Sequence, residues 1–281
     1  MPFKSIAVFI GTSPSAEARV AFAARLACRH GAHLIGLYAV PSLMSGTAAE
    51  SFVLGHTAVH EVIAHHRARE DEAIRLAKQS LSAICGRQGA SFEFRPLVQA
   101  EFGDDLVLNS LHADLIIAGG HPGNGGFPNG WSAERLLLAT GVPCILLPDS
   151  WNGSAAAEHV VVAWNASREA RRAIADALPL LLTAKSVTVL LVDPEKNSRH
   201  GEEPGADIAH YLSRHGAKVA VEQVASNGAP VASVILDRAK QHAAGLVVIG
   251  AYSHARAAQM VLGGVTRSLL REAALPLLIA H

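Results

Sequence analysis

The chain repeats its own pattern once, and this repeat constrains the fold more than any other feature of the sequence. A short apolar run at residues 7–10 is followed by a helix-like Ala/Arg segment and a second apolar run at 33–40. The same order returns 154 residues later, with apolar runs at 161–163 and 187–192. The sequence therefore predicts two copies of one structural unit.

The two copies differ in length because the first contains an insertion. Residues 114–119 match 245–250 at an offset of 131, so 23 extra residues fall in the first copy. They lie around residues 45–79, an Ala/His/Glu/Arg stretch that we expect to be helical. A short polar linker separates the two predicted domains, residues 1–148 and 157–281.

Within each copy, short continuous runs of Val, Ile and Leu alternate with helical patterns. Such runs suit strands that are buried on both faces of a parallel sheet. One helix is expected to begin at Ser167 as its N-cap, with Glu169 in the first turn. The predicted class is α/β, with two tandem Rossmann-like domains, each a five-stranded, mainly parallel sheet flanked by helices. Ligands of such sheets bind at the carboxyl ends of the strands, where the strand order reverses.

The composition excludes several classes of protein. Lys plus Arg (24) balance Asp plus Glu (24), so we expect no nucleic acid and no anionic membrane as partner, because both need clustered positive charge. No apolar run reaches the roughly eighteen residues that a membrane-spanning helix needs. Cys28, Cys85 and Cys144 lie far apart in the chain, which predicts buried, reduced thiols and a cytoplasmic location.

The segment after the fourth strand of the second copy is the most informative for chemistry. A strand is expected to end at Gly250, and Gly263 and Gly264 precede a new helical pattern. Glycine lets backbone N–H groups approach a phosphate closely, and the free amides of a helix N-terminus stabilise the anion. Thr266 and Ser268 would add hydroxyl donors. Standard G-x-G-x-x-G and Walker phosphate loops are absent from the expected positions.

This segment resembles the nucleotide motif of the universal stress protein (UspA) family, which reads G-x-x-G, nine residues, and then G-[ST]. Gly250 fits the first glycine, whereas Ser253 stands at the second. The nine residues 254–262 lead to Gly263, and Gly264 stands where Ser or Thr is usual. Both copies match the family's layout, so the chain resembles a tandem member with domains of the adenine nucleotide alpha hydrolase-like type.

The resemblance implies that the second domain binds ATP or another adenine nucleotide. Val192 would then contact the adenine and Asn165 the ribose. Asn165 replaces the family's aspartate and lacks the charge that would hold Mg²⁺ firmly, so a role for Mg²⁺ stays open. The residues implied to wrap the phosphates are Gly250, Ser253, Gly263, Gly264, Val265 and Thr266.

The first copy has lost more of this motif. Gly119 and Gly130 hold its end positions, but Trp131 occupies the place of Gly264. Gly11 stands where the family has its aspartate. Because an indole would crowd a phosphate that needs close backbone approach, no nucleotide is expected in the first domain.

Two other functions stay open. The chain could be a regulatory or interaction protein that has lost nucleotide binding in both copies, as the residues at 165, 253 and 264 favour. It could also be a slow ATP hydrolase, although no catalytic signature is present and no catalytic residue is assigned. On structural grounds alone, Gly250 could simply end a strand, and Gly263 and Gly264 could simply open a helix.

The histidines offer a weaker candidate site. His56 and His60 lie four residues apart in the insertion, and His65 and His66 follow. No carboxylate or cysteine completes a recognised ligand spacing, so no metal site is predicted.

Each copy is expected to end in a short apolar strand, at residues 143–147 and 276–280. In the family these fifth strands pair across a dimer, and a fused pair can do so within one chain. Such pairing would remove two exposed apolar edges. We therefore expect an intramolecular pseudo-dimer with its two sheets back to back around a pseudo-two-fold axis, with a homodimer as a further possibility.

Overall fold

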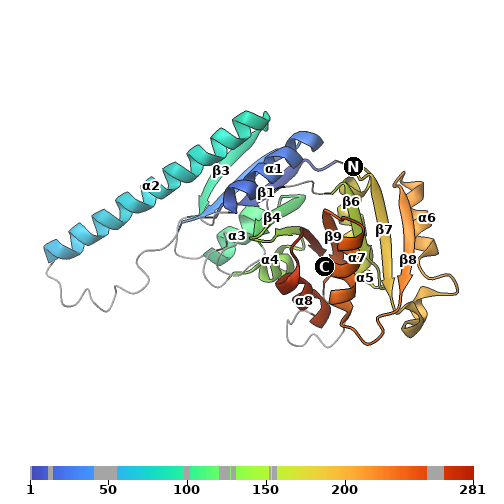
Figure 1. The fold of residues 1–281 in the computed structure, drawn as a ribbon. Helices are drawn as coiled ribbons and strands as arrows, with labels where there is room; N and C mark the ends of the chain where they lie inside the picture. The colour runs from blue at the N-terminus through green and yellow to red at the C-terminus, as the bar shows by residue number, and fades with distance from the viewer. Residues whose placement is uncertain are drawn as a thin grey trace.

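The structure is a computed structural model (Figure 1), and it describes residues 2–11, 15–40, 56–97, 102–119, 127, 131–151, 153, 157–251 and 263–281. Ser253 and residues 254–262 of the predicted motif lie outside the described residues, as do Gly130 and the side chains of His56 and His60.

The described strands and helices alternate in both halves of the chain. The first half contains β1 (Ser5–Phe9), α1 (Ala16–His30), β2 (His33–Ala39), α2 (His56–Gln88), β3 (Phe92–Leu97), α3 (Phe102–Ser110), β4 (Leu115–Gly119), α4 (Ala133–Thr140) and β5 (Cys144–Leu147). The second half contains β6 (His159–Ala163), α5 (Arg168–Leu181), β7 (Ser186–Val192), α6 (Ala206–Arg214), β8 (Val219–Val224), α7 (Val231–Gln241), β9 (Leu246–Gly250), α8 (Gly264–Glu272) and β10 (Leu277–Ala280), with short 3-10 turns at Pro194–Lys196 and Ser198–His200.

The ten strands of the described residues belong to one continuous sheet in the order β3-β2-β1-β4-β5-β10-β9-β6-β7-β8. Each half contributes five parallel strands in the same relative order, as the repeat predicts. The predicted pairing of the fifth strands is confirmed, because β5 and β10 pair antiparallel with Ile145 opposite Leu278.

The expected back-to-back arrangement of two sheets is wrong. The main chains of β5 and β10 satisfy each other's hydrogen bonds, so the halves join edge to edge rather than face to face. A pair of strands that would otherwise be exposed edges thus becomes the centre of one larger sheet.

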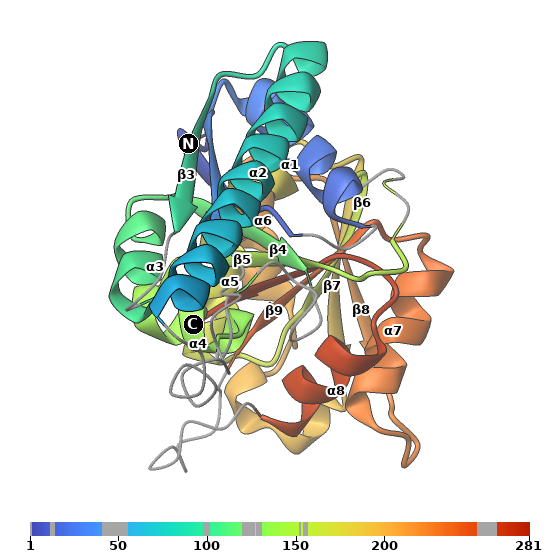
Figure 2. The ribbon, with the colours of Figure 1, turned by 90° about the vertical axis from the view of Figure 1, so that its left-hand side faces the viewer.

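Helices cover both faces of this sheet (Figures 1 and 2). One hydrophobic core unites α1, α2, α5 and α6 with one face, and it includes Val20, Leu81, Ile174 and Leu212. The other core lies against α3, α4, α7 and α8 and includes Leu106, Leu136, Ile235 and Leu269. Because both faces are covered, the central strands are buried on both sides, which explains their continuous apolar runs.

The helix α5 begins as the sequence predicts. The Ser167 side chain accepts a hydrogen bond from the Ala170 amide at 3.1 Å, and Glu169 lies in the first turn. Ala173, Ile174 and Ala177 form its buried face against the sheet. An N-cap and an apolar stripe at helical spacing are therefore sufficient to position this helix.

The insertion contributes to α2, which has 33 residues, whereas its counterpart α6 has nine. The C-terminal part of α2 packs on the core through Leu81, Ile84 and Cys85. Its N-terminal part extends past the edge of the sheet in Figure 1.

The three cysteines are free thiols, but only two of them are buried. Burial raises the pKa of Cys85 to about 11 and that of Cys144 to about 12, so both thiols stay protonated. The expectation that Cys28 is buried is wrong, because it lies on the exposed side of α1.

Candidate functional site

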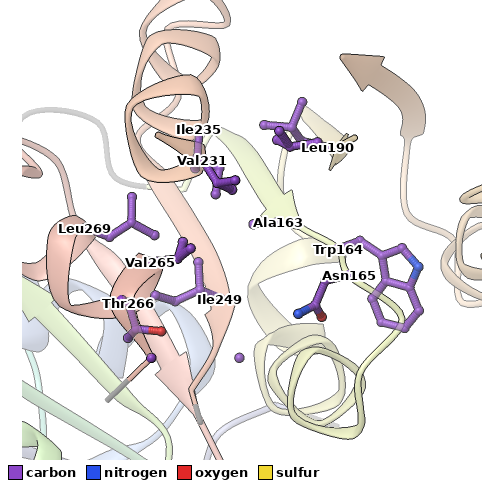
Figure 3. A pocket seen from close by; sticks show the side chains of 14 residues that line it. Ala163, Trp164, Asn165, Leu190, Val231, Ile235, Ile249, Val265, Thr266 and Leu269 are labelled. Carbon is purple, nitrogen blue, oxygen red and sulfur yellow. The ribbon is translucent and has the colours of Figure 1, made fainter. Parts of the chain in front are cut away.

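A cavity of about 160 Å³ opens at the carboxyl ends of β6, β7 and β9 in the second half. The strand order reverses here, because β7 lies on one side of β6 and β9 lies on the other. Parallel sheets bind ligands at such a point. The cavity is lined by Ala163, Trp164, Asn165, Leu190, Val192, Val231, Ile235, Ile249, Gly250, Gly263, Gly264, Val265, Thr266 and Leu269 (Figure 3).

Seven of the eight predicted binding residues line this one cavity, and the eighth, Ser253, lies outside the described residues. The seven are Asn165, Val192, Gly250, Gly263, Gly264, Val265 and Thr266. Segments far apart in the sequence are therefore brought together around a single space, as the motif spacing requires.

The apolar wall of the cavity was not predicted residue by residue. It consists of Leu190 and Ile249 from the strands, Val231 and Ile235 from α7, and Leu269 from α8. Residues 231 and 235 lie four apart, which places both on one face of the helix. Helical spacing could have identified that face, but it could not show that the face borders a cavity.

The N-terminus of α8 borders the cavity and, among the described residues, has no side-chain cap. Its N-cap is Gly263, which has no side chain to cap the first amides, and the first turn contains no acid. Thr266 is only 6% exposed, and its hydroxyl forms no hydrogen bond within the described residues. In Figure 3 this hydroxyl points into the cavity. A hydroxyl that borders the cavity can donate a hydrogen bond to a ligand there and accept one from it.

A second helix also begins at the cavity without a cap. Helix α7 starts at Val231 after Pro230, with no side-chain cap and no acid in its first turn. In contrast, α4 and α5 begin with a capping serine and a glutamate. The positive ends of the α7 and α8 dipoles therefore remain uncompensated by a first-turn carboxylate, which favours an anionic ligand.

Asn165 is held in a defined orientation by the loop between β6 and α5. Its side-chain oxygen accepts a hydrogen bond from the Ser167 amide at 3.2 Å, and its carbonyl accepts one from the Asn197 side chain at 2.9 Å. Ala166, which lies between Asn165 and Ser167 in the chain, has a left-handed backbone conformation, with φ of 54°. This geometry directs the nitrogen of the Asn165 amide toward the cavity, opposite Thr266 in Figure 3.

Gly250 has a packing role that the sequence did not reveal. A β-carbon at this position would lie 2.3 Å from the Ala170 nitrogen and 2.4 Å from the Glu169 carbonyl carbon. Glycine at 250 therefore allows β9 to approach the first turn of α5. Gly263 and Gly264 differ, because a β-carbon at either position would meet no atom of the described residues within 4 Å.

Asp193 fixes the strand end that carries Val192. Its carboxylate accepts hydrogen bonds from the Ser226 amide and hydroxyl and from Lys196, each at 2.6 Å. Hydrogen bonds from Lys196 and Ser226 lower the pKa of Asp193 to about 2. The contact ties the end of β7 to the segment after β8, beside the cavity.

The equivalent region of the first half is filled by aromatic side chains. Phe9, in the position of Ala163, is fully buried, and its ring lies 4.6 Å from that of Phe127 between centroids. Trp131, in the position of Gly264, lies under the Arg135 guanidinium at 4.5 Å. The first half therefore places large side chains where the second half has alanine and glycine.

Among the described residues, no helix is both long and apolar enough to cross a bilayer. A sequence model described as the universal stress protein family matches residues 157–281. No curated protein matches the chain in sequence.

Two solved structures share the fold over nearly the whole chain. A universal stress protein from Archaeoglobus fulgidus DSM 4304 is 14% identical, covering 98% of this chain and 97% of its own, with a TM-score of 0.72. A functionally unknown protein from Pseudomonas aeruginosa PAO1 is 15% identical, covering 99% and 92%, with a TM-score of 0.58. Residues 157–281 thus match the model of the universal stress protein family, and the first half of the chain repeats the same α/β fold.

Proposed function

We propose that the second half of the chain binds an adenine nucleotide, with ATP as the first candidate. The observation that carries this proposal is the N-terminus of α8, which has no side-chain cap and whose Thr266 hydroxyl faces a cavity with an apolar back wall. Such a site offers donors to phosphate at one end and a nonpolar surface to a base at the other. The choice of adenine rests on the family resemblance of the glycine spacing.

The two ends of the cavity suit the two ends of a nucleotide. The α8 end contributes the amides of Gly264, Val265 and Thr266, which no side chain caps. The opposite end is bounded by Leu190 and Val192 of β7 and by Ile235 of α7. Asn165 lies between these ends, where a ribose would connect base and phosphate.

The open cavity favours a ligand-binding role over an interaction protein without a ligand. Loss of nucleotide binding would leave the crevice free to fill with side chains, as Phe9 and Phe127 do in the first half. In the second half, Ala163 keeps that space open. A slow hydrolase is not favoured, because no ionisable side chain is among the described residues that line the cavity.

The test uses substitutions at Gly263, where an added β-carbon would meet no atom within 4 Å in the part of the chain that the structure describes. In Gly263→Asp, the carboxylate would occupy the N-cap, accept from the α8 amides and repel phosphate. We expect ATP binding by calorimetry to be lost while the melting temperature is maintained or raised. Gly263→Ala is the matched control, because its backbone, with φ of −56° and ψ of 148°, accepts any residue.

Two results would contradict the proposal. One is the absence of binding by the wild-type chain at millimolar ATP. The other is unchanged affinity in Gly263→Asp, since a carboxylate on the phosphate-binding amides cannot be neutral toward an anion. Trp164 lines the cavity and gives an independent fluorescence signal.

A further inference from the structure

We infer that Asn197 is a positioning residue of the second-half site, which holds the loop between β6 and α5 in place through the main chain of Asn165. This inference rests on the proposed function and adds to it a residue that acts on the ligand through another. Three observations carry it: the hydrogen bonds of Asn197, the backbone of Ala166 and the anchoring of the segment that contains Asn197.

The chemistry of its partners fixes the orientation of the Asn197 side chain. The main-chain N–H of Arg199 can only donate, so the atom that lies 3.2 Å from it is the Asn197 side-chain oxygen. The main-chain carbonyl of Asn165 can only accept, so the atom that lies 2.9 Å from it is the Asn197 side-chain nitrogen. The oxygen therefore caps the turn at Ser198–His200, while the nitrogen joins this turn to the loop that follows β6.

The loop that Asn197 contacts contains a backbone conformation that is unfavourable for alanine. Ala166 has a φ of 54°, in the left-handed region that a β-carbon disfavours. Such a conformation persists where surrounding contacts hold it. Asn197 binds the carbonyl of the peptide bond that precedes Ala166, and the Ser167 amide, which follows Ala166, donates to the Asn165 side chain. The left-handed residue is thus fixed from both sides.

This loop forms part of the cavity wall. Trp164 and Asn165 line the cavity, and Ser167 begins α5 directly after them. In Figure 3, Asn165 lies across the cavity from Thr266. A rotation of the peptide bond between Asn165 and Ala166 would move this part of the wall, so the contact with Asn197 helps to set the shape of the site.

Asn197 is itself held in place by the segment that leads to it from β7. The Asp193 carboxylate accepts hydrogen bonds from the Ser226 amide and hydroxyl, each at 2.6 Å. The main-chain N–H of Asn197 donates to the Pro194 carbonyl at 3.1 Å. The segment is therefore fixed to the ends of β7 and β8, and its contact with Asn165 extends this connection to the end of β6.

Two substitutions separate the positioning role of Asn197 from its role as a cap. In Asn197→Ser, the hydroxyl can still accept from the Arg199 amide, because serine is a good N-cap, but the shorter side chain does not reach the Asn165 carbonyl. Ala166→Gly removes the β-carbon that makes the left-handed backbone unfavourable. The loop should then keep its conformation without the contact from Asn197.

The experiment measures ATP affinity by calorimetry for the wild type, the two single variants and the double variant, with thermal unfolding as the check of folding. Asn197→Ser should weaken binding by about three- to tenfold, the effect of one hydrogen bond. The double variant should regain most of this affinity. Ala166→Gly alone is the matched control and should bind as the wild type does. A role of Asn197 in its own turn would not be repaired by a change at position 166.

The outcomes separate this inference from the proposed function. If Asn197→Ser binds ATP as tightly as the wild type, or if the double variant binds no better than Asn197→Ser, the inference is wrong and the nucleotide site remains. If the wild type does not bind ATP, the proposed function fails, and the inference fails with it.

Discussion

Gly250 lies so close to the first turn of α5 that a β-carbon on it would be 2.3 Å from the backbone nitrogen of Ala170. No side chain is involved in this contact, so no rotamer change can relieve it. We predict that Gly250→Ala destabilises the chain by about 1–3 kcal/mol, the range of overpacked cores. Chemical denaturation monitored by circular dichroism measures this loss.

Gly263→Ala serves as the control for Gly250→Ala, because its added methyl would meet none of the described atoms within 4 Å. We expect its unfolding free energy to stay within about 0.5 kcal/mol of the wild type. Equal destabilisation by the two substitutions would contradict the assignment of Gly250 to packing rather than to ligand approach.

Ala163 keeps the second-half cavity open, whereas Phe9 fills the same place in the first half. We predict that Ala163→Phe abolishes nucleotide binding, because its ring would occupy the space between β6 and α8.

Calorimetry on the wild type should give one nucleotide per chain. A stoichiometry of two would show that Phe9 and Phe127 do not block nucleotide binding in the equivalent region of the first half.

Ser167 caps α5 and also donates its backbone amide to the side chain of Asn165. Ser167→Ala removes the cap and should lower the unfolding free energy by about 1 kcal/mol. The backbone contact to Asn165 persists in this variant, so ATP affinity should change little. A large loss of ATP affinity with unchanged stability would contradict these assignments, because the Ser167 side chain would then act on the ligand site and not on the start of α5.

The repeat and the glycine spacing predicted the positions of strands, helices and most lining residues because these depend on local pattern. Buried parallel strands give continuous apolar runs, and Gly263 with Gly264 marks the start of α8. The spacing did not show why position 250 must be glycine, because the conflicting atoms belong to α5, far away in the chain.

Contacts between side chains that are far apart in the chain could also not be predicted from the sequence. Trp131 led to the prediction that the first half has no nucleotide site, but the side chains that pack together there are Phe9 and Phe127. No local pattern relates these two phenylalanines, because only the packing of the sheet brings them together. The edge-to-edge joint through β5 and β10 likewise depends on which strand edges remain unpaired in three dimensions.

The carboxylate of Asp193 makes stability depend on pH at the end of β7. Its pKa falls to about 2 in the folded chain because Lys196 and Ser226 donate hydrogen bonds to it. An aspartate in an unfolded chain has a pKa of about 4. The folded state therefore gains stability from the ionised group above about pH 4 and loses it as the pH falls toward about 2.

Asp193→Asn tests this dependence, because asparagine tolerates the left-handed backbone, with φ of 50°, and can still accept from the Ser226 amide. It cannot ionise, so the wild type should exceed it in urea-unfolding free energy at about pH 6, and the difference should shrink steadily between about pH 4 and pH 2. Lys196→Met, which removes one donor and keeps Ser226, should reduce the pH-dependent difference without removing it. If the difference between wild type and Asp193→Asn instead stays constant from about pH 6 to pH 2, the pKa of Asp193 is the same in the folded and the unfolded chain. Lys196 and Ser226 would then not favour the ionised form of this carboxylate over the protonated form, which would contradict the prediction.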